Sequence, residues 1–381
     1  MNCRERALAA LDHKEPDRVP IDFGGRHTTL HLFAHQALMA HLGLSGPEPK
    51  IRSYHTYLVE PDPQLLQRFE RVTEVFFARP PDDYVFRIDP ATNTYVDEWG
   101  TKYYMPPDGY YFDMCENPLA TAETEADLRA YRWPNPRDPS RIAGLAERVR
   151  AAYEAGEKVV MMGSAIGGLF EQAWYLLGIE QSYIHLAANQ KLMEALSDRL
   201  LAWLMDYWDM TLDAVGPYLD LVHIQEDLGW QNGPLMSPET FRRIYKPRWR
   251  QLVDAIKKKT RARVYLHSCG SIHWAIPDII DCGVEALNPV QVNAADMDSA
   301  RLKREFGRDL TFWGGGCDPV ALQNGTPQQV REEVRRRIGD LAPGGGYVFA
   351  SVHNIQANVP PENIVALFDA AREFGEYPIS R

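Results

Sequence analysis

The second half of the chain alternates short apolar runs with longer amphipathic segments. Each apolar run ends in polar or glycine residues, and a stretch with helical spacing of apolar positions follows it. Strands that alternate with helices in this way are typical of βαβ units around a parallel sheet. The pattern predicts strands over residues 159–163, 221–225, 264–267, 286–290, 310–313 and 347–350.

Proline and serine mark the starts of the helices predicted between these strands. Ser237-Pro238-Glu239 and Pro360-Pro361-Glu362 are typical helix N-termini. Strand–helix units that recur every roughly 25–60 residues favour a closed (β/α)8 barrel over a short open sheet. The predicted helices cover residues 238–258, 276–282, 327–337 and 361–373.

The first 150 residues are less regular. We expect a helix over residues 4–11 and a strand over residues 19–23 that ends at Gly24-Gly25. Residues 80–140 are rich in Pro, Tyr and Asp and lack helical periodicity, so we expect a loop or hairpin insertion near the barrel mouth. The prediction is one α/β domain over residues 1–381, a (β/α)8 TIM barrel with an elaborated N-terminal region.

Composition narrows the classes of function. Hydrophobic residues make up 45% and charged residues 24% of the 381 positions, as in ordinary globular proteins. The net charge of −11 argues against nucleic-acid or anionic-membrane partners. The sequence contains no signal-peptide pattern and no apolar run long enough to span a bilayer. Five cysteines give no disulfide framework, so we expect a cytoplasmic protein.

His267 and Cys269 form the most informative motif. Both follow the apolar run at residues 264–266, and alternate residues of a strand point to the same face. Imidazole nitrogen and thiolate sulfur are ligands that zinc prefers. The spacing alone is common, so its weight comes from the other strand ends.

Those other strand ends also carry reactive side chains, which a barrel would bring to one face. We expect Arg26, Asn288 and Gln291 to contact substrate. Glu226 and Asp227 are the candidate acid–base residues, with helix capping as the alternative, and period-two alternation turns Asp227 into the mouth. An enzyme is therefore the leading class.

The order of several motifs resembles the uroporphyrinogen decarboxylase superfamily. The resemblance is carried by the opening helix with Pro16-Asp17-Arg18-Val19-Pro20, and by Leu266-His267-Ser268-Cys269-Gly270, Gly316-Cys317-Asp318-Pro319, His353-Asn354-Ile355-Gln356 and Pro360-Pro361-Glu362-Asn363-Ile364. It implies a single (β/α)8 barrel, usually dimeric, so we expect a homodimer.

Within that superfamily the chain is similar to the zinc-dependent methyltransferases of the methylcobalamin:coenzyme M type. The resemblance implies zinc on His267 and Cys269, with His353 as third ligand and Cys317 as its rival. It also implies a partner that carries cobalamin, namely a corrinoid protein, and a thiol or tetrahydrofolate as the small-molecule acceptor. Zinc would hold an acceptor thiol as its thiolate, and Asp227 would orient the acceptor or take its proton.

The alternative is a metal-free decarboxylase or lyase that acts on a tetrapyrrole or another polycarboxylate. Such a substrate needs several cationic contacts, for which Arg26, Arg52 and His353 are the candidates. A third class, a non-catalytic module that binds a corrinoid or tetrapyrrole, would use the same pocket. Bound zinc that is lost when Cys269 is replaced would distinguish a methyltransferase from both of these alternatives.

Overall fold

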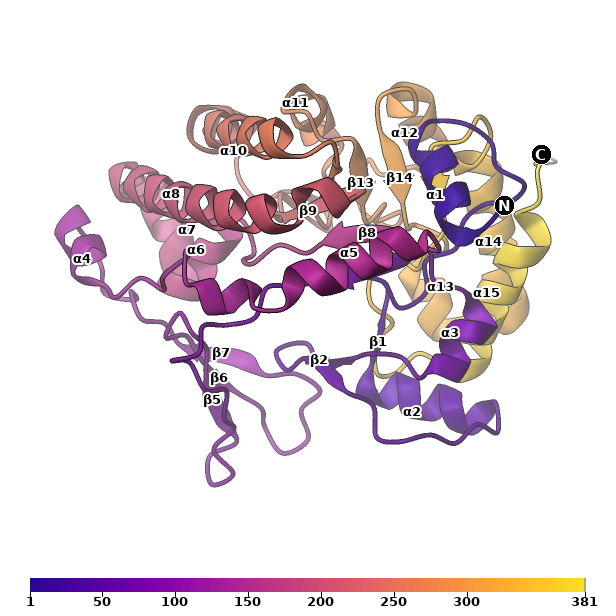
Figure 1. Cartoon of the computed structure of the whole chain (residues 1–381), viewed down its shortest axis with the longest axis horizontal. Coiled ribbons are helices and arrows are strands. Elements are labelled where there is room, and N and C mark those ends of the chain that lie inside the picture. The colour runs from indigo at the N-terminus through magenta and orange to yellow at the C-terminus, as the bar shows by residue number, and fades with distance from the viewer. Residues whose placement is uncertain (380–381) are drawn as a thin grey trace.

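A computed structural model describes residues 1–379 of the chain. Its centre is a curled sheet of seven parallel strands in the order β15-β14-β13-β12-β9-β8-β4, with helices around the outside (Figure 1). This is the predicted barrel. The strands are β4 (Thr73–Phe76), β8 (Val159–Met162), β9 (Leu221–Gln225), β12 (Arg263–His267), β13 (Ala286–Asn288), β14 (Thr311–Trp313) and β15 (Tyr347–Val348).

The predicted strand at residues 19–23 joins the two edges of this sheet. Asp22 donates its backbone N–H to Phe349, just after β15, and Phe23 donates to Glu70, just before β4. The Asp22 carboxylate adds bonds to Thr73 on β4 (2.7 Å) and to the Trp313 indole on β14 (3.1 Å). The segment therefore takes the eighth strand's place as isolated bridges, and it closes the barrel.

The predicted helices are present, with one change. The stretch at residues 238–258 divides into α9 (Pro238–Thr240), a π-helical turn (Phe241–Tyr245) and α10 (Lys246–Lys259). Pro247 has no N–H to continue the regular pattern, so the wide turn comes just before it. The others match as α1 (Cys3–Leu11), α11 (Ile276–Asp281), α14 (Pro327–Leu341) and α15 (Pro361–Phe374).

The remaining helices complete the outer layer or lie in the N-terminal region. They are α2 (Leu32–His41), α3 (Pro63–Phe69), α4 (Glu125–Ala130), α5 (Leu145–Ala155), α6 (Phe170–Leu177), α7 (Ile179–Ala188), α8 (Gln190–Val215), α12 (Ser299–Phe306) and α13 (Pro319–Asn324).

Two apolar cores follow from the alternation of side chains along the strands. A large core fills the space between strands and helices, and a small one fills the barrel itself. Leu221, Tyr265 and Trp313 belong to the small core. The apolar face of α1 covers this core at the end of the barrel where the strands begin. On β9 and β12, His223 and His267 lie two residues beyond Leu221 and Tyr265, so they also face the interior.

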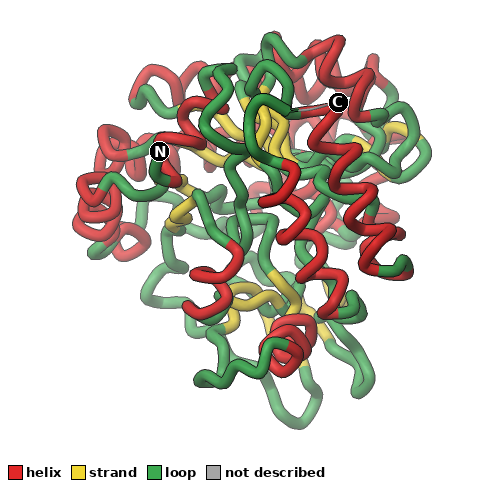
Figure 2. Tube along the Cα trace, turned by 90° about the vertical axis from the view of Figure 1, so that its right-hand side faces the viewer, coloured by secondary structure: helices red, strands yellow, loops and turns green. Residues whose placement is uncertain are grey.

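The N-terminal region adds two antiparallel sheets. One joins β1 (Leu30–His31), β3 (Leu58–Val59) and β2 (Ile51–Ser53), and the other joins β5 (Thr94–Val96), β6 (Lys102–Tyr104) and β7 (Asp113–Glu116). The second sheet projects away from the barrel strands in Figure 1, and Figure 2 shows the molecule from the side, with strands both in its upper part and near its lower end. A two-stranded ribbon, β10 (Gly229–Trp230) with β11 (Gly233–Pro234), follows β9. Over residues 1–379, every helix is too short or too polar to cross a membrane.

Candidate active site

His267 ends β12, and Cys269 follows it in a tight turn. The Sγ atom of Cys269 lies 3.4 Å from Nε2 of His267. Gly270 takes φ +85°, and a Cβ there would lie 2.2 Å from the backbone of Gly229, so only glycine fits this turn. The local geometry therefore holds the thiol beside the imidazole.

Asn288 sets the tautomer of His267. The amide nitrogen of Asn288 donates to the carbonyl of Trp313 (3.0 Å), which leaves its oxygen to accept from Nδ1 of His267 (2.6 Å). Burial lowers the pKa of His267 well below its ordinary value, so the ring is neutral and its single proton is on Nδ1. The lone pair on Nε2 therefore points toward the Cys269 sulfur.

Asp227, two residues after the end of β9, completes this group. Its Oδ1 accepts the backbone N–H of Cys269 (2.8 Å), and ligand atoms of Asp227, His267 and Cys269 all lie within 4.8 Å of one another. Burial and the Asp227 carboxylate raise the pKa of the Cys269 thiol well above its ordinary value. A cation in this position would reverse that effect and stabilise the thiolate.

A second group contains His27, His267 and His353, whose ligand atoms also lie within 4.8 Å of one another. The two groups share only His267, so His353 reaches His267 but does not form a group with Cys269. Among residues 1–379, Asp227 rather than His353 is the third donor within reach of both His267 and Cys269.

His27 is less suited to a metal because its lone pair is engaged. The backbone N–H of Ser164 donates to Nδ1 of His223 (3.0 Å), which places the proton of neutral His223 on Nε2. That N–H faces Nε2 of His27 (3.1 Å), which must accept it. Burial keeps both rings neutral by lowering their pKa values well below the ordinary value.

The donor set at Asp227, His267 and Cys269 fits zinc. One neutral imidazole nitrogen, one sulfur and one carboxylate oxygen are all ligands found in zinc proteins. The His267–Asn288 bond is the outer contact that usually orients a zinc-bound imidazole.

Two predicted site residues face away from the mouth. Glu226 is fully buried and accepts backbone N–H groups of Leu169, Phe170 and Glu171, so it caps α6. Cys317 is buried in the large core between strands and helices, and its sulfur lies against the Asp318 carbonyl. The structure therefore brings neither Glu226 nor Cys317 to the His267–Cys269 group.

Asn288 and Gln291, predicted to contact substrate, form hydrogen bonds to neighbouring residues. Both polar atoms of the Asn288 side-chain amide are engaged, the oxygen with His267 and the nitrogen with Trp313. Gln291 accepts the Gly270 N–H (2.8 Å) and donates to Gln231 (3.0 Å), so it braces the turn after Cys269.

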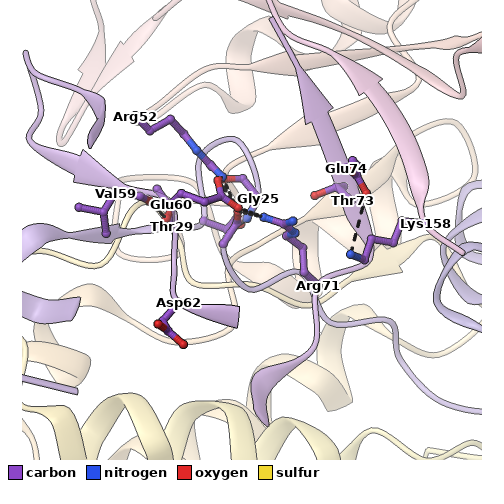
Figure 3. Close-up of polar contacts among 12 residues, drawn as sticks. Gly25, Thr29, Arg52, Val59, Glu60, Asp62, Arg71, Thr73, Glu74 and Lys158 are labelled. Atoms are coloured by element: carbon purple, nitrogen blue, oxygen red, sulfur yellow. Dashed lines mark hydrogen bonds and ion pairs between the residues drawn. The ribbon is translucent and has the colours of Figure 1, made fainter. Parts of the chain in front are cut away.

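Arg26 lies on the loop after Gly24-Gly25. Arg52 donates to the Gly25 carbonyl (2.7 Å) and pairs with Glu60, which also binds Arg71 (Figure 3). Arg52 is therefore occupied in holding this loop. Arg26 stacks on Phe77, with 4.9 Å from its guanidinium carbon to the ring centroid.

Arg26 opens into a cavity of about 450 Å³ between the strand ends and the projecting sheet. Sequence reasoning missed two residues near the site, Glu171 in the cavity wall and His223 in the barrel. Burial and the Asp227 charge raise the pKa of Glu171 well above its ordinary value. A histidine in an otherwise apolar strand was the available signal for His223, whereas Glu171 lies in an ordinary helix start. The cavity walls include Arg26, Tyr54, Phe86, Tyr95, Asp97, Glu98, Tyr103, Glu171, Tyr175 and Gln225.

Comparison with known proteins identifies the family. The family model for uroporphyrinogen decarboxylase (URO-D) matches residues 97–374, well over half of the chain. The chain therefore belongs to the uroporphyrinogen decarboxylase family.

Relatives in that family carry out different reactions. The methylcobamide:CoM methyltransferase MtaA of Methanosarcina barkeri is 30% identical over 140 residues, 37% of this chain and 38% of that protein. The uroporphyrinogen decarboxylase of Pseudoalteromonas translucida is 27% identical over 191 residues, 49% of this chain and 50% of that protein. The matches thus span half or less of these two curated relatives.

A solved methyltransferase from Methanosarcina mazei shares the fold over nearly the whole length. Its TM-score is 0.62 at 21% identity, and the superposition covers 98% of this chain and 99% of that one. The likeness confirms the barrel fold.

Proposed function

We propose that this protein is a zinc-dependent methyltransferase that moves a methyl group between a corrinoid protein and a small acceptor, a thiol or tetrahydrofolate. The observation that carries the proposal is the His267–Cys269 pair, with an imidazole lone pair aimed at a thiol 3.4 Å away. The methyltransferase relative supports it. A homodimer belongs to the same proposal.

The residues divide the work as follows. His267 and Cys269 would hold zinc, and Asp227 is the third donor that the geometry favours. Bound zinc would supply a Lewis acid that holds an acceptor thiol as its thiolate at neutral pH, where a free thiol with a pKa of about 8.5 is mostly protonated. Asn288 fixes the His267 tautomer, and Gln291 holds the turn that presents Cys269.

His353 is free for the acceptor. Burial and the nearby Arg26 charge lower its pKa to about 4, so the ring is neutral at pH 7. A neutral imidazole beside His267 can accept a hydrogen bond from the incoming molecule. His353 would thus orient the acceptor.

Metal analysis of two matched variants tests the proposal. We expect about one zinc per chain, lost in Cys269→Ala and kept in Cys317→Ala, because the Cys317 sulfur lies in the large core between strands and helices. Free methylcobalamin with a thiol or tetrahydrofolate then reports methyl transfer through its visible spectrum. Wild-type zinc content and activity in Cys269→Ala would reject the proposal.

A metal-free decarboxylase is the second candidate, favoured by the decarboxylase relatives and by Arg26, a cation in the cavity wall. The surroundings of Arg26 count against it. Arg52 is already occupied in the loop, so Arg26 is the guanidinium that remains for a ligand in the cavity wall. The many carboxylates of a tetrapyrrole would find one cationic partner there, which is unfavourable for the rest. Zinc-independent loss of CO₂ from uroporphyrinogen would establish this alternative.

A further inference from the structure

The cavity at Arg26 combines two features that bear on its ligand. One side consists of aromatic rings, and the other contains Arg26, whose Nε is buried without a hydrogen-bonding partner among residues 1–379. Its volume, about 450 Å³, lies within the range of pockets that bury small ligands.

The aromatic side is built from three separate segments. Tyr54, in the loop after β2, stacks on Phe86 with ring centroids 4.4 Å apart. Phe86 then meets Tyr95 of β5 at 5.1 Å, and Tyr95 stacks on Tyr103 of β6 at 4.8 Å. Tyr54, Phe86 and Tyr95 precede residue 97, where the family match begins, and Tyr103 lies within the matched region, so most of this wall lies outside it.

The acidic groups of the cavity are already satisfied. Asp97 accepts the N–H groups of Trp99 and Thr101, each at 2.9 Å. Glu98 pairs with Arg141, a contact that covers both carboxylate oxygens. These carboxylates therefore do not require a cation from a ligand.

Glu171 is satisfied in the same way. Its carboxyl group accepts the Gln225 amide at 2.8 and 3.1 Å and the Tyr175 hydroxyl at 3.3 Å. Both carboxyl oxygens are thus occupied by Gln225 and Tyr175, and within residues 1–379 neither of them bonds to Arg26.

Arg26 differs from these acids. Its Nε is buried without a partner, and within residues 1–379 its guanidinium forms no hydrogen bond or ion pair. Stacking on Phe77 satisfies the face of the guanidinium but none of its N–H groups. Arg26 is half-buried and faces the cavity, so a ligand that supplies an anionic acceptor would pair with its guanidinium favourably.

We propose that the cavity binds a planar aromatic molecule that carries a carboxylate, with the carboxylate on Arg26 and the ring against the tyrosines. This rests on the proposed function and deepens it, because it favours an acceptor of the tetrahydrofolate kind over a small aliphatic thiol. Gln225 lines the cavity and pairs in register with His267, so the ligand reaches the strand end that presents the candidate zinc group.

Calorimetry with three probes tests the assignment. 4-Aminobenzoate and tetrahydrofolate should bind the wild type, and uncharged 4-aminobenzamide should bind at least tenfold more weakly than 4-aminobenzoate. Arg26→Gln should weaken 4-aminobenzoate by tenfold or more, about 1.4 kcal/mol, and leave the benzamide unaffected. The matched control is Arg87→Gln, the same change at an exposed position outside the cavity wall, which should bind as the wild type does.

Two results would overturn the assignment. One is equal binding of 4-aminobenzoate by wild type and a folded Arg26→Gln, with the fold checked by circular dichroism. The other is no binding of either aromatic anion by the folded wild type. 2-Mercaptoethanesulfonate is the aliphatic control, and binding of this probe alone would also reject an aromatic ligand.

The same variants separate this inference from the proposed function. Cys269→Ala should lose zinc and methyl transfer yet bind 4-aminobenzoate normally, because Cys269 is not part of the cavity wall. Aromatic binding without methyl transfer in the wild type would reject the function and keep the pocket. Methyl transfer without aromatic binding would do the reverse.

Discussion

Replacing Asn288 with alanine tests how the site controls zinc affinity. The Asn288 side chain is fully buried, and its oxygen is the acceptor for the proton on Nδ1 of His267. Without that acceptor, the proton can move to Nε2, which removes the lone pair that faces Cys269. The change therefore weakens a ligand without touching the metal.

The expected losses of zinc affinity and of stability follow from the two hydrogen bonds that Asn288 makes. Removing an outer partner of a zinc-bound histidine typically lowers metal affinity by about 10–100-fold. That factor is about 1.4–2.7 kcal/mol at 25 °C. The Trp313 carbonyl also loses a buried donor, so we expect the free energy of unfolding of the metal-free protein to fall by about 1–3 kcal/mol.

Competition with a chromophoric chelator measures the zinc affinity, and urea unfolding measures the stability. Asn288→Asp keeps an acceptor for Nδ1 and should retain more affinity than the alanine variant. Asn293→Ala is the matched control, because its side chain has no bond to His267. Wild-type zinc affinity in a folded Asn288→Ala would refute the role of this bond.

Three further predictions follow from the same contacts. Asp227→Asn should lower zinc affinity at least tenfold, whereas His353→Ala should keep the zinc and lose turnover. Metal analysis that shows zinc lost in His353→Ala and kept in Asp227→Asn would make His353 the third ligand. Glu226→Ala leaves the first N–H groups of α6 without their acceptor, so the free energy of unfolding measured in urea should fall by about 3 kcal/mol or more. Glu226→Gln should have an intermediate stability, and wild-type stability in the alanine variant would contradict the capping role. Burial raises the pKa of Asp97 from 3.8 to about 6, so the folded state holds this proton more tightly than the unfolded state, and stability should fall as pH rises from about 4 to above 6. Asp97→Asn should remove up to about 3 kcal/mol of that decline in melting profiles between pH 4 and 7.5, since each pKa unit is about 1.36 kcal/mol; identical profiles would show an ordinary carboxylate.

Much of the barrel could be predicted from the sequence because strands and helices have local periodicities. The strands β8, β9 and β12–β15 and the helices α1, α10, α11, α14 and α15 are predicted to within a few residues, whereas α6–α8 and α12, which also lie between those strands, are not among the predicted helices. β4 was missed because it is short and contains Glu74, which interrupts the apolar pattern. The strand at residues 286–290 ends early, at Asn288, because Pro289 has no N–H for the ladder.

The sequence by itself determined that His267 and Cys269 share one face, since alternation along a strand is a property of the local backbone. The same alternation turned Asp227, and not Glu226, toward Cys269. Which third donor reaches both His267 and Cys269 depended on how far apart the strand ends lie. That spacing comes from barrel curvature and loop conformation, which no local pattern encodes. Within residues 1–379, the lack of a partner for Nε of Arg26 is likewise a result of the tertiary structure, because Arg52 and Glu171 bind other residues.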